Sequence, residues 1–218
     1  MKTATSAKSC CRSPPSKKVC LGRRQLGAPE FPIFRNREKG QRMEGPRSNI
    51  VLIGMPGAGK STVGVVVAKL LAMDFIDTDV LIQAREKRTL QAIIRAEGLS
   101  ALKQVEEQTL LELAVEQAVI ATGGSAVYSD AAMAALKRRG IAVFLDVPLP
   151  ELVERLNDLD ARGVVMEPGE SLTDLYRKRL PLYRRHADLR LDCGGKSAGQ
   201  VALETVAAVR PLLASAAS

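Results

Sequence analysis

The chain has 218 residues, of which 46% are hydrophobic and 26% are charged, a balance typical of a soluble globular protein. No apolar run approaches the roughly 18 residues that a membrane-spanning helix needs, so we expect no membrane partner. The formal charge of +8 comes from residues 1–42, where eleven Lys and Arg face two Glu. Because these residues carry +9 and the remainder −1, the charge gives no support for a nucleic-acid partner.

Residues 1–48 are rich in Pro, Ser, Lys, Arg and Gly and show no helical or strand periodicity, which predicts a disordered basic tail before one domain at 49–213. This segment has three interpretations: a transit peptide for an organelle, a basic arm, or sequence upstream of a natural start at Met43. We favour the third, and therefore a cytoplasmic protein. Only Cys193 lies in the domain and the chain has no C-x-x-C pair, so neither a zinc site nor a disulfide scaffold is indicated.

From Asn49 onward, predicted strands and helices alternate, which indicates an α/β fold: a single three-layer α/β/α domain with a parallel five-stranded sheet. The expected strands are Asn49–Ile53, Asp74–Asp77, Ala118–Thr122, Ile141–Asp146 and Leu189–Asp192. The expected helices are Lys60–Ala72, Thr89–Glu97, Leu99–Gln117, Asp130–Arg139, Pro150–Asn157, Ser171 to about His186, and Ala198–Leu213. Asp158–Glu170 contains Gly and Pro without periodicity, which predicts a mobile lid.

The segment Gly54-Met-Pro-Gly-Ala-Gly-Lys-Ser61 matches the phosphate-loop pattern G-x-x-x-x-G-K-S, between a buried strand and a helix. Its glycines let backbone N–H groups face inward, toward the positive end of the following helix dipole. Lys60 can reach the β- and γ-phosphates, and the Ser61 hydroxyl can ligate Mg²⁺. The pattern therefore predicts ATP and Mg²⁺ as cofactors, with nucleotide contacts from Gly57, Ala58, Gly59, Lys60, Ser61 and Thr62.

Two aspartates follow the second predicted strand, at the sheet edge where α/β proteins bind ligands. A spacing of two in an extended segment places Asp77 and Asp79 on one side. One carboxylate would hold Mg²⁺ through water, and the other would orient or deprotonate an acceptor hydroxyl. The alternative is that Asp79 only caps a helix beginning at Val80. Gly123 and Gly124 end the third strand at the same edge, where a glycine pair makes a tight turn or admits a ligand to the main chain.

Two arginines are further candidates. Arg162 lies in the predicted lid, where a cation can close over the transferred phosphate. Arg179 belongs to the basic run 177–185, most of which we expect to be a solvated helix face, but an inward guanidinium would hold a substrate carboxylate in a two-pronged contact. His186, the only histidine, is expected on the surface or in packing, because phosphoryl transfer needs mainly positioning and charge neutralisation.

These segments together resemble the shikimate kinase family, in the nucleoside-monophosphate-kinase-like group of phosphate-loop folds. The likeness runs from Asn49 to about Val209. It rests on Gly54–Thr62, Phe75-Ile-Asp-Thr-Asp79, Glu97-Gly98, Val105-Glu-Glu107, Ala121-Thr-Gly-Gly124, the lid arginine and Arg179-Leu-Pro-Leu-Tyr183. The resemblance implies transfer of the ATP γ-phosphate to the 3-hydroxyl of shikimate, a small-molecule substrate of aromatic amino-acid synthesis. We expect a monomer.

The resemblance also implies roles for individual residues. Asp77 resembles the magnesium-linked aspartate, and Asp79 the residue that binds the shikimate hydroxyls and is a candidate base. Gly123 and Gly124 resemble the first two glycines of a substrate-contacting triplet. Arg155 resembles a residue near the adenine, and Arg162 resembles the lid arginine near the phosphates. Arg179 resembles the arginine that binds the substrate carboxylate. Lys60, Asp79 and Arg162 are the expected catalytic residues.

Three positions depart from the family pattern. Lys103 stands where a second substrate-binding arginine is usual, which keeps the charge but loses the forked geometry. Ser125 replaces the third glycine of the triplet, and the lid has Gly after Arg162 where Pro is usual. A kinase of another small hydroxy acid, such as gluconate or homoserine, is therefore an alternative. A nucleotide-binding regulatory homologue without turnover is a third, although the retained phosphate-loop and aspartate residues argue against it.

Overall fold

Strands β1 (Asn49–Ile53) and β4 (Gly140–Asp146) are buried along their whole length. Because a strand covered on both faces needs no polar side, their continuous apolar runs place them at the centre of a parallel sheet. The computed structural model describes residues 47–156, 166 and 169–214. In it, β1 and β4 are neighbours in a five-stranded sheet of order β2-β3-β1-β4-β5, and every pairing is parallel. The other strands are β2 (Asp74–Asp77), β3 (Ala118–Ala121) and β5 (Leu189–Asp192).

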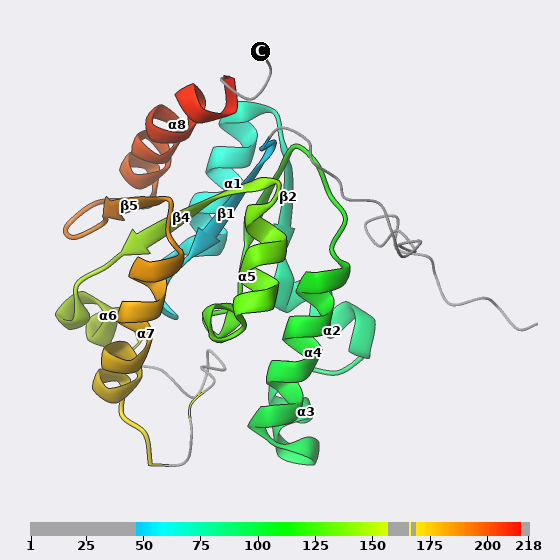
Figure 1. The fold of residues 1–218 in the computed structure, drawn as a ribbon. Coiled ribbons are helices and arrows are strands. Elements are labelled where there is room, and N and C mark those ends of the chain that lie inside the picture. Colours follow the sequence, from blue (N-terminus) through cyan, green and yellow to red (C-terminus); the bar gives the residue numbers. More distant parts are fainter. Residues whose placement is uncertain (1–46, 157–165, 167–168, 215–218) are drawn as a thin grey trace, which may run out of the picture. The chain divides into compact units, whose positions relative to one another are not determined.

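Helices cover both faces of the sheet (Figure 1). On one face α1 (Lys60–Leu71) packs against α8 (Ala198–Ala214), and on the other α5 (Asp130–Lys137) and α7 (Leu172–His186) contact β4. The remaining helices are α2 (Thr78–Glu86), α3 (Leu90–Glu97), α4 (Leu99–Glu112), the short 3₁₀ helix η1 (Ala126–Tyr128) and α6 (Leu149–Arg155). The predicted α/β class with a parallel five-stranded sheet is confirmed.

Local capping sets several helix starts where the sequence places them. Thr89 accepts a hydrogen bond from the Ala92 amide at the start of α3, and Ser129 does the same for the Ala132 amide at the start of α5. Ser171 and Asp174 form a reciprocal capping box at the start of α7. These contacts satisfy backbone N–H groups that a helix leaves without partners in its first turn.

One predicted helix is too long. The sequence predicts a helix over Leu99–Gln117, but α4 ends at Glu112, and Leu113 has an extended backbone. The five residues before β3 run as a connection whose Val115 carbonyl accepts a 2.8 Å hydrogen bond from Asn49 Nδ2 at the start of β1. Since this partner is 66 residues away in the sequence, helical spacing alone does not reveal the earlier end.

Two sequence predictions concern residues outside the described ranges. The predicted tail lies there except for Arg47 and Ser48, and so does most of the predicted lid, with Arg162. Ser48 donates a 2.9 Å backbone hydrogen bond to the Arg139 carbonyl, and Arg47 lies 3.6 Å from the Asp188 carboxylate. Among the residues that the model describes, no helix is both long and apolar enough to cross a membrane.

Candidate active site

The parallel register brings the carboxyl ends of three strands to one edge of the sheet. Leu52 of β1 and Asp77 of β2 both lie beside Ala121 of β3. The segments that follow these strands therefore meet: the phosphate loop after β1, helix α2 after β2 and the glycine turn after β3. They line one cavity of about 290 Å³. This cavity is the candidate active site.

The phosphate loop has the conformation that its glycines predict. Gly59 is the N-cap of α1 with a φ of 86°, in the left-handed region that favours glycine. Lys60 Nζ donates hydrogen bonds of 2.9 Å to the carbonyls of Gly54 and Met55, which hold the ammonium group at the mouth of the loop. Gly57, Gly59, Lys60, Ser61 and Thr62 all line the cavity, whereas Ala58 is buried beneath it.

Ser61 and Asp77 are direct neighbours. Ser61 Oγ donates a 2.6 Å hydrogen bond to Asp77 Oδ2. Asp77 Oδ1 accepts from the backbone N–H groups of Asp79 and Val80, at 3.0 and 3.3 Å, which makes Asp77 the N-cap of α2. The alternative that Asp79 caps a helix beginning at Val80 is wrong, since α2 begins at Thr78. The prediction that Asp77 and Asp79 share one side of an extended segment is also wrong, because Asp79 lies in the first turn of α2. Both aspartates nevertheless line the cavity.

Asp79 and Lys60 share a buried environment. Burial raises the pKa of Asp79, and the charge of Lys60 partly opposes that effect. Burial lowers the pKa of Lys60 to about 8, against the opposing charge of Asp79. Each group therefore reduces the cost of keeping the other charged in this desolvated place. The cavity thus holds an ammonium group at its phosphate-loop end and a carboxylate of raised basicity beside it.

The glycine turn after β3 leaves room for two carboxylates. A Cβ atom at Gly123 would overlap with Glu106 Oε1 and lie only 2.7 Å from Asp79 Oδ1. The Gly123 amide donates a 3.0 Å hydrogen bond to Thr78 Oγ1, which fixes the turn against α2. Gly123 is therefore required by close approach, and its main chain forms the floor of the cavity between Asp79 and Glu106.

Glu106 is a buried carboxylate that belongs to the segment Val105-Glu-Glu107 of the family resemblance, but it has no role of its own in the sequence analysis. It lies on α4 with 4% exposure and accepts a 2.5 Å hydrogen bond from Ser125 Oγ. Burial raises the pKa of Glu106 to about 7, the Ser125 hydrogen bond lowers it, and Asp79 raises it. Its other oxygen, Oε1, is buried and has no hydrogen-bond partner among the described residues. The available signal was a carboxylate at an apolar position of α4, between buried Leu102 and Leu110.

Arg179 is the inward member of the basic run on α7. Arg179 is 2% exposed and lines the cavity. Its Nη1 atom lies 2.8 Å from the position that a Cβ atom at Gly124 would take. One helical turn later, Tyr183 donates a 2.7 Å hydrogen bond to the Gly124 carbonyl and stacks on Phe144 of β4, with ring centroids 5.1 Å apart. These contacts fix α7 against the sheet and the glycine turn. Arg179 therefore has the inward position that the predicted carboxylate-binding arginine requires, and its role stays a prediction.

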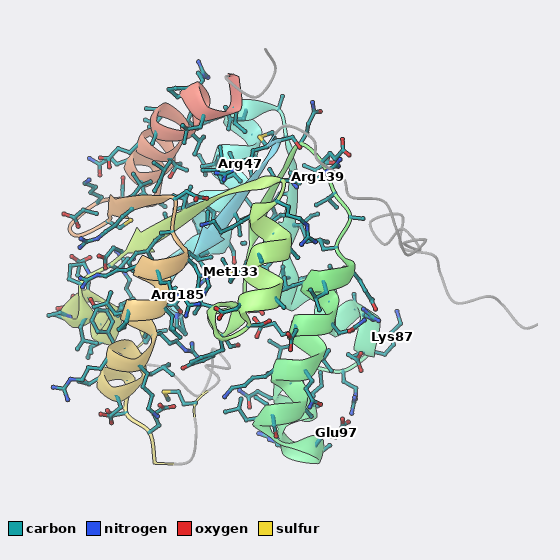
Figure 2. The ribbon with its side chains drawn as sticks, in the orientation of Figure 1. Arg47, Lys87, Glu97, Met133, Arg139 and Arg185 are labelled. Atoms are coloured by element: carbon teal, nitrogen blue, oxygen red, sulfur yellow. The ribbon has the colours of Figure 1, made fainter. Side chains whose placement is uncertain are left out.

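The rest of the basic run is arranged as expected. The side chain of Arg185, labelled in Figure 2, is 61% exposed and lies 2.8 Å from the Asp130 carboxylate. His186 Nε2 lies 3.2 Å from the same carboxylate, His186 is not among the residues that line the cavity, and burial lowers the pKa of His186. The histidine therefore packs between α7 and α5, in agreement with the expected packing role.

Two sequence-predicted residues lie beside the cavity. Arg155 Nη1 donates a 3.5 Å hydrogen bond to the Gly57 carbonyl, and Nη2 lies 3.1 Å from Glu151 one turn earlier in α6. Lys103 Nζ lies 5.0 Å from the centre of the Tyr128 ring and lines a neighbouring cavity of about 350 Å³. Glu106 and Ser125 line both cavities and so form the wall between them.

A loop of this pattern at this sheet edge is typical of nucleotide-phosphate sites, and carboxylates and a guanidinium line the rest of the same cavity. The fold and the site together define a phosphate-loop kinase. The family model described as shikimate kinase matches residues 56–210. The chain therefore belongs to the shikimate kinase family, whose members are ATP-dependent phosphotransferases.

Individual relatives agree with this assignment. A shikimate kinase of Aromatoleum aromaticum is 43% identical over 156 residues, which cover 70% of this chain and 89% of the relative. A solved shikimate kinase of Acinetobacter baumannii in complex with shikimate superposes with a TM-score of 0.70 at 33% identity, covering 75% of this chain and 93% of the other. A shikimate kinase structure from Aquifex aeolicus has a TM-score of 0.64 at 30% identity, with coverages of 74% and 96%.

Proposed function

We propose that this chain transfers the γ-phosphoryl group of ATP to the 3-hydroxyl of shikimate, giving shikimate 3-phosphate and ADP. The observation that carries this proposal is the shared cavity, in which Lys60 of the phosphate loop, Asp79 of α2 and Arg179 of α7 line one space. Phosphoryl transfer requires both substrates to be held in line in a site that neutralises developing charge. The family assignment and a shikimate-bound relative support shikimate as the acceptor.

In this proposal the nucleotide occupies the phosphate-loop half of the cavity. The N–H groups of Gly57 to Thr62 and the Lys60 ammonium bind the phosphates, and Arg155 beside the loop lies near the adenine. Ser61 and Asp77 would hold Mg²⁺, because a hydroxyl and a carboxylate 2.6 Å apart suit a cation that takes few protein ligands and completes its shell with phosphates and water. When bound, Mg²⁺ neutralises phosphate charge. Arg162 lies outside the described residues, and its catalytic role stays a prediction.

The acceptor occupies the half of the cavity opposite the loop. Asp79 orients the 3-hydroxyl and accepts its proton, which its raised pKa favours relative to an ordinary aspartate. Gly123 and Gly124 let the acceptor approach the main chain. The Arg179 guanidinium binds the acceptor carboxylate.

A second candidate acceptor class, another small hydroxy acid, has one structural observation in its favour. Ser125 and Glu106 form a hydrogen-bonded polar corner in the cavity wall, and the family's usual glycine has no side chain with which to form it. An acceptor bound beside this corner would meet a hydroxyl and a carboxyl group where the family's usual glycine offers no side chain. Lys103, on the neighbouring cavity, is the other changed position.

A coupled assay of ADP release with shikimate, gluconate and homoserine tests the proposal, with ³¹P NMR to identify the phosphorylated position. Turnover with shikimate and a product phosphate on the 3-hydroxyl is the expected result. Turnover with gluconate or homoserine alone would replace shikimate by the second acceptor class. If the wild type binds ATP but turns over none of the three acids, the regulatory alternative gains support.

A further inference from the structure

Tyr128 connects the glycine turn to two cations. It ends η1, which follows the turn Gly123-Gly124-Ser125 directly, and it is 40% exposed. Its hydroxyl accepts a 3.3 Å hydrogen bond from Arg179 Nε, and the Arg179 guanidinium carbon lies 5.3 Å from the ring centre. Lys103 Nζ lies 5.0 Å from the same ring centre. One aromatic side chain therefore contacts the cations of two different helices, α4 and α7.

These contacts hold the cations without cancelling their charge. A tyrosine ring attracts a cation through its quadrupole, and its hydroxyl accepts a hydrogen bond, but the side chain stays neutral. A carboxylate in the same place would compete with an acceptor carboxylate for the guanidinium. The neutral contact through Nε fixes the plane of the Arg179 fork, and Nη1 lies beside Gly124 at the cavity.

The ring also bears on the position where this chain has a lysine. A lysine ammonium is a point charge on a flexible stem and lacks the rigid fork of arginine. A ring contact restrains such a stem, because it gives the ammonium a preferred place beside the aromatic face. The Tyr128 side chain therefore restrains Lys103 and also orients Arg179. Because both cations contact the same ring, Tyr128 sets how far apart they lie.

We propose that Tyr128 is the positioning residue of the acceptor-carboxylate subsite, holding the Arg179 guanidinium toward Gly124 and the Lys103 ammonium beside it. This inference rests on the proposed function, in which Arg179 binds a carboxylate. Tyr128 is not among the residues that line the candidate active-site cavity, so it acts through Arg179 and Lys103. Its effect is specific: it acts on acids rather than on ATP, and on binding rather than on the chemical step.

Two variants separate the contributions of the hydroxyl and the ring. Tyr128→Phe keeps the ring and removes the hydrogen bond to Arg179, which should raise the acceptor KM about fivefold. Tyr128→Leu removes the ring contacts with both cations as well, which should bring the increase to about fiftyfold. In both variants kcat and the KM for ATP should change less than about twofold, since the lost interaction binds ground state and transition state alike.

A matched control and a carboxylate-free substrate make the test specific. Tyr176→Phe removes a hydroxyl from the same helix as Arg179, but Tyr176 lines a separate surface cavity with Asp146 and Arg190, so its KM values should stay at the wild-type level. The methyl ester of the acceptor lacks the carboxylate, so its KM should be the same in wild type and Tyr128→Leu. An unchanged acid KM in both Tyr128 variants, or an equal rise for acid and ester, would overturn the inference.

The outcome can be told apart from failure of the proposed function. If the wild type phosphorylates gluconate or homoserine instead of shikimate, the proposed acceptor is wrong, and the same KM comparison is made with that acid, because each carries a carboxylate. If the wild type turns over none of them, the dissociation constant of shikimate measured by calorimetry replaces KM. Weaker shikimate binding by Tyr128→Leu than by Tyr176→Phe then supports the inference, whereas equal binding or no binding overturns it.

Discussion

Replacing Glu106 with glutamine should change how the stability of the protein depends on pH. Glu106 is buried between the two cavities, faces the charges of Asp79, Lys60 and Arg179, and accepts one hydrogen bond, from Ser125. Burial raises its pKa from the ordinary 4.5 to about 7. Between these two values the folded state keeps a proton that the unfolded state has released. The free energy of unfolding must therefore fall as the pH rises through this window.

The size of the effect follows from the two pKa values. Each pKa unit corresponds to about 1.4 kcal/mol, so the contribution of Glu106 falls by about 3 kcal/mol from below pH 4.5 to above pH 7. Glutamine has a similar shape and carries no titratable proton. Glu106→Gln should therefore lose less stability over this range than the wild type, by about the same 3 kcal/mol.

Urea unfolding of both proteins, followed by circular dichroism at pH values from 5 to 8, measures this difference. The other titratable groups are common to both chains, so the variant-minus-wild-type difference reports Glu106 together with its smaller effect on the neighbouring Lys60. Ser125→Ala is the matched partner: since the Ser125 hydrogen bond lowers the pKa of Glu106, its removal should move the loss of stability to higher pH. Parallel curves for wild type and Glu106→Gln would refute the assignment of a protonated, buried Glu106.

Three further predictions concern the cavity. Lys60→Ala should lower kcat at least about a hundredfold in the ADP-release assay by removing a cation from the transferred phosphate, and near-normal turnover would contradict that role. Arg179→Ala should raise the acceptor KM about a hundredfold through loss of a charged contact, whereas exposed Arg177→Ala should not. Gly123→Ala should lower kcat about a hundredfold by displacing Asp79, unlike Gly199→Ala, where a Cβ meets nothing within 4 Å.

The sheet and the phosphate loop could be predicted from sequence because their signals are local. The apolar runs of β1 and β4 need both faces covered, and the loop pattern specifies its own backbone. Capping residues such as Ser171 are likewise read within one turn of the chain. The early end of α4 escaped prediction because it depends on a hydrogen bond between Val115 and Asn49, which only the folded sheet brings together.

The residues of the candidate site likewise differ in whether the sequence alone predicts them. Lys60 stands in the loop pattern and Asp79 and Gly123 follow strand ends, while Arg179 is assigned through the family resemblance, and all four line one cavity. Tyr128 belongs to no pattern. Its importance depends on contacts with α4 and α7, which are far from it in the chain. Side chains that position other side chains leave no spacing of their own, and their detection requires the structure.

Two of the three departures from the family pattern, Lys103 and Ser125, lie beside the proposed acceptor site, and the third, in the lid, lies outside the described residues. Ser125 contacts Glu106 and Lys103 contacts Tyr128, and all four residues line the cavity next to the proposed acceptor site. The phosphate loop, by contrast, has its full pattern and contacts. Because Ser125 and Lys103 lie at the proposed acceptor wall and the phosphate loop keeps its full pattern, changes in that wall can alter which acid is bound while the transfer chemistry is kept. We therefore expect substitutions in the wall that Ser125, Glu106, Lys103 and Tyr128 share to change acceptor selection while ATP use is kept.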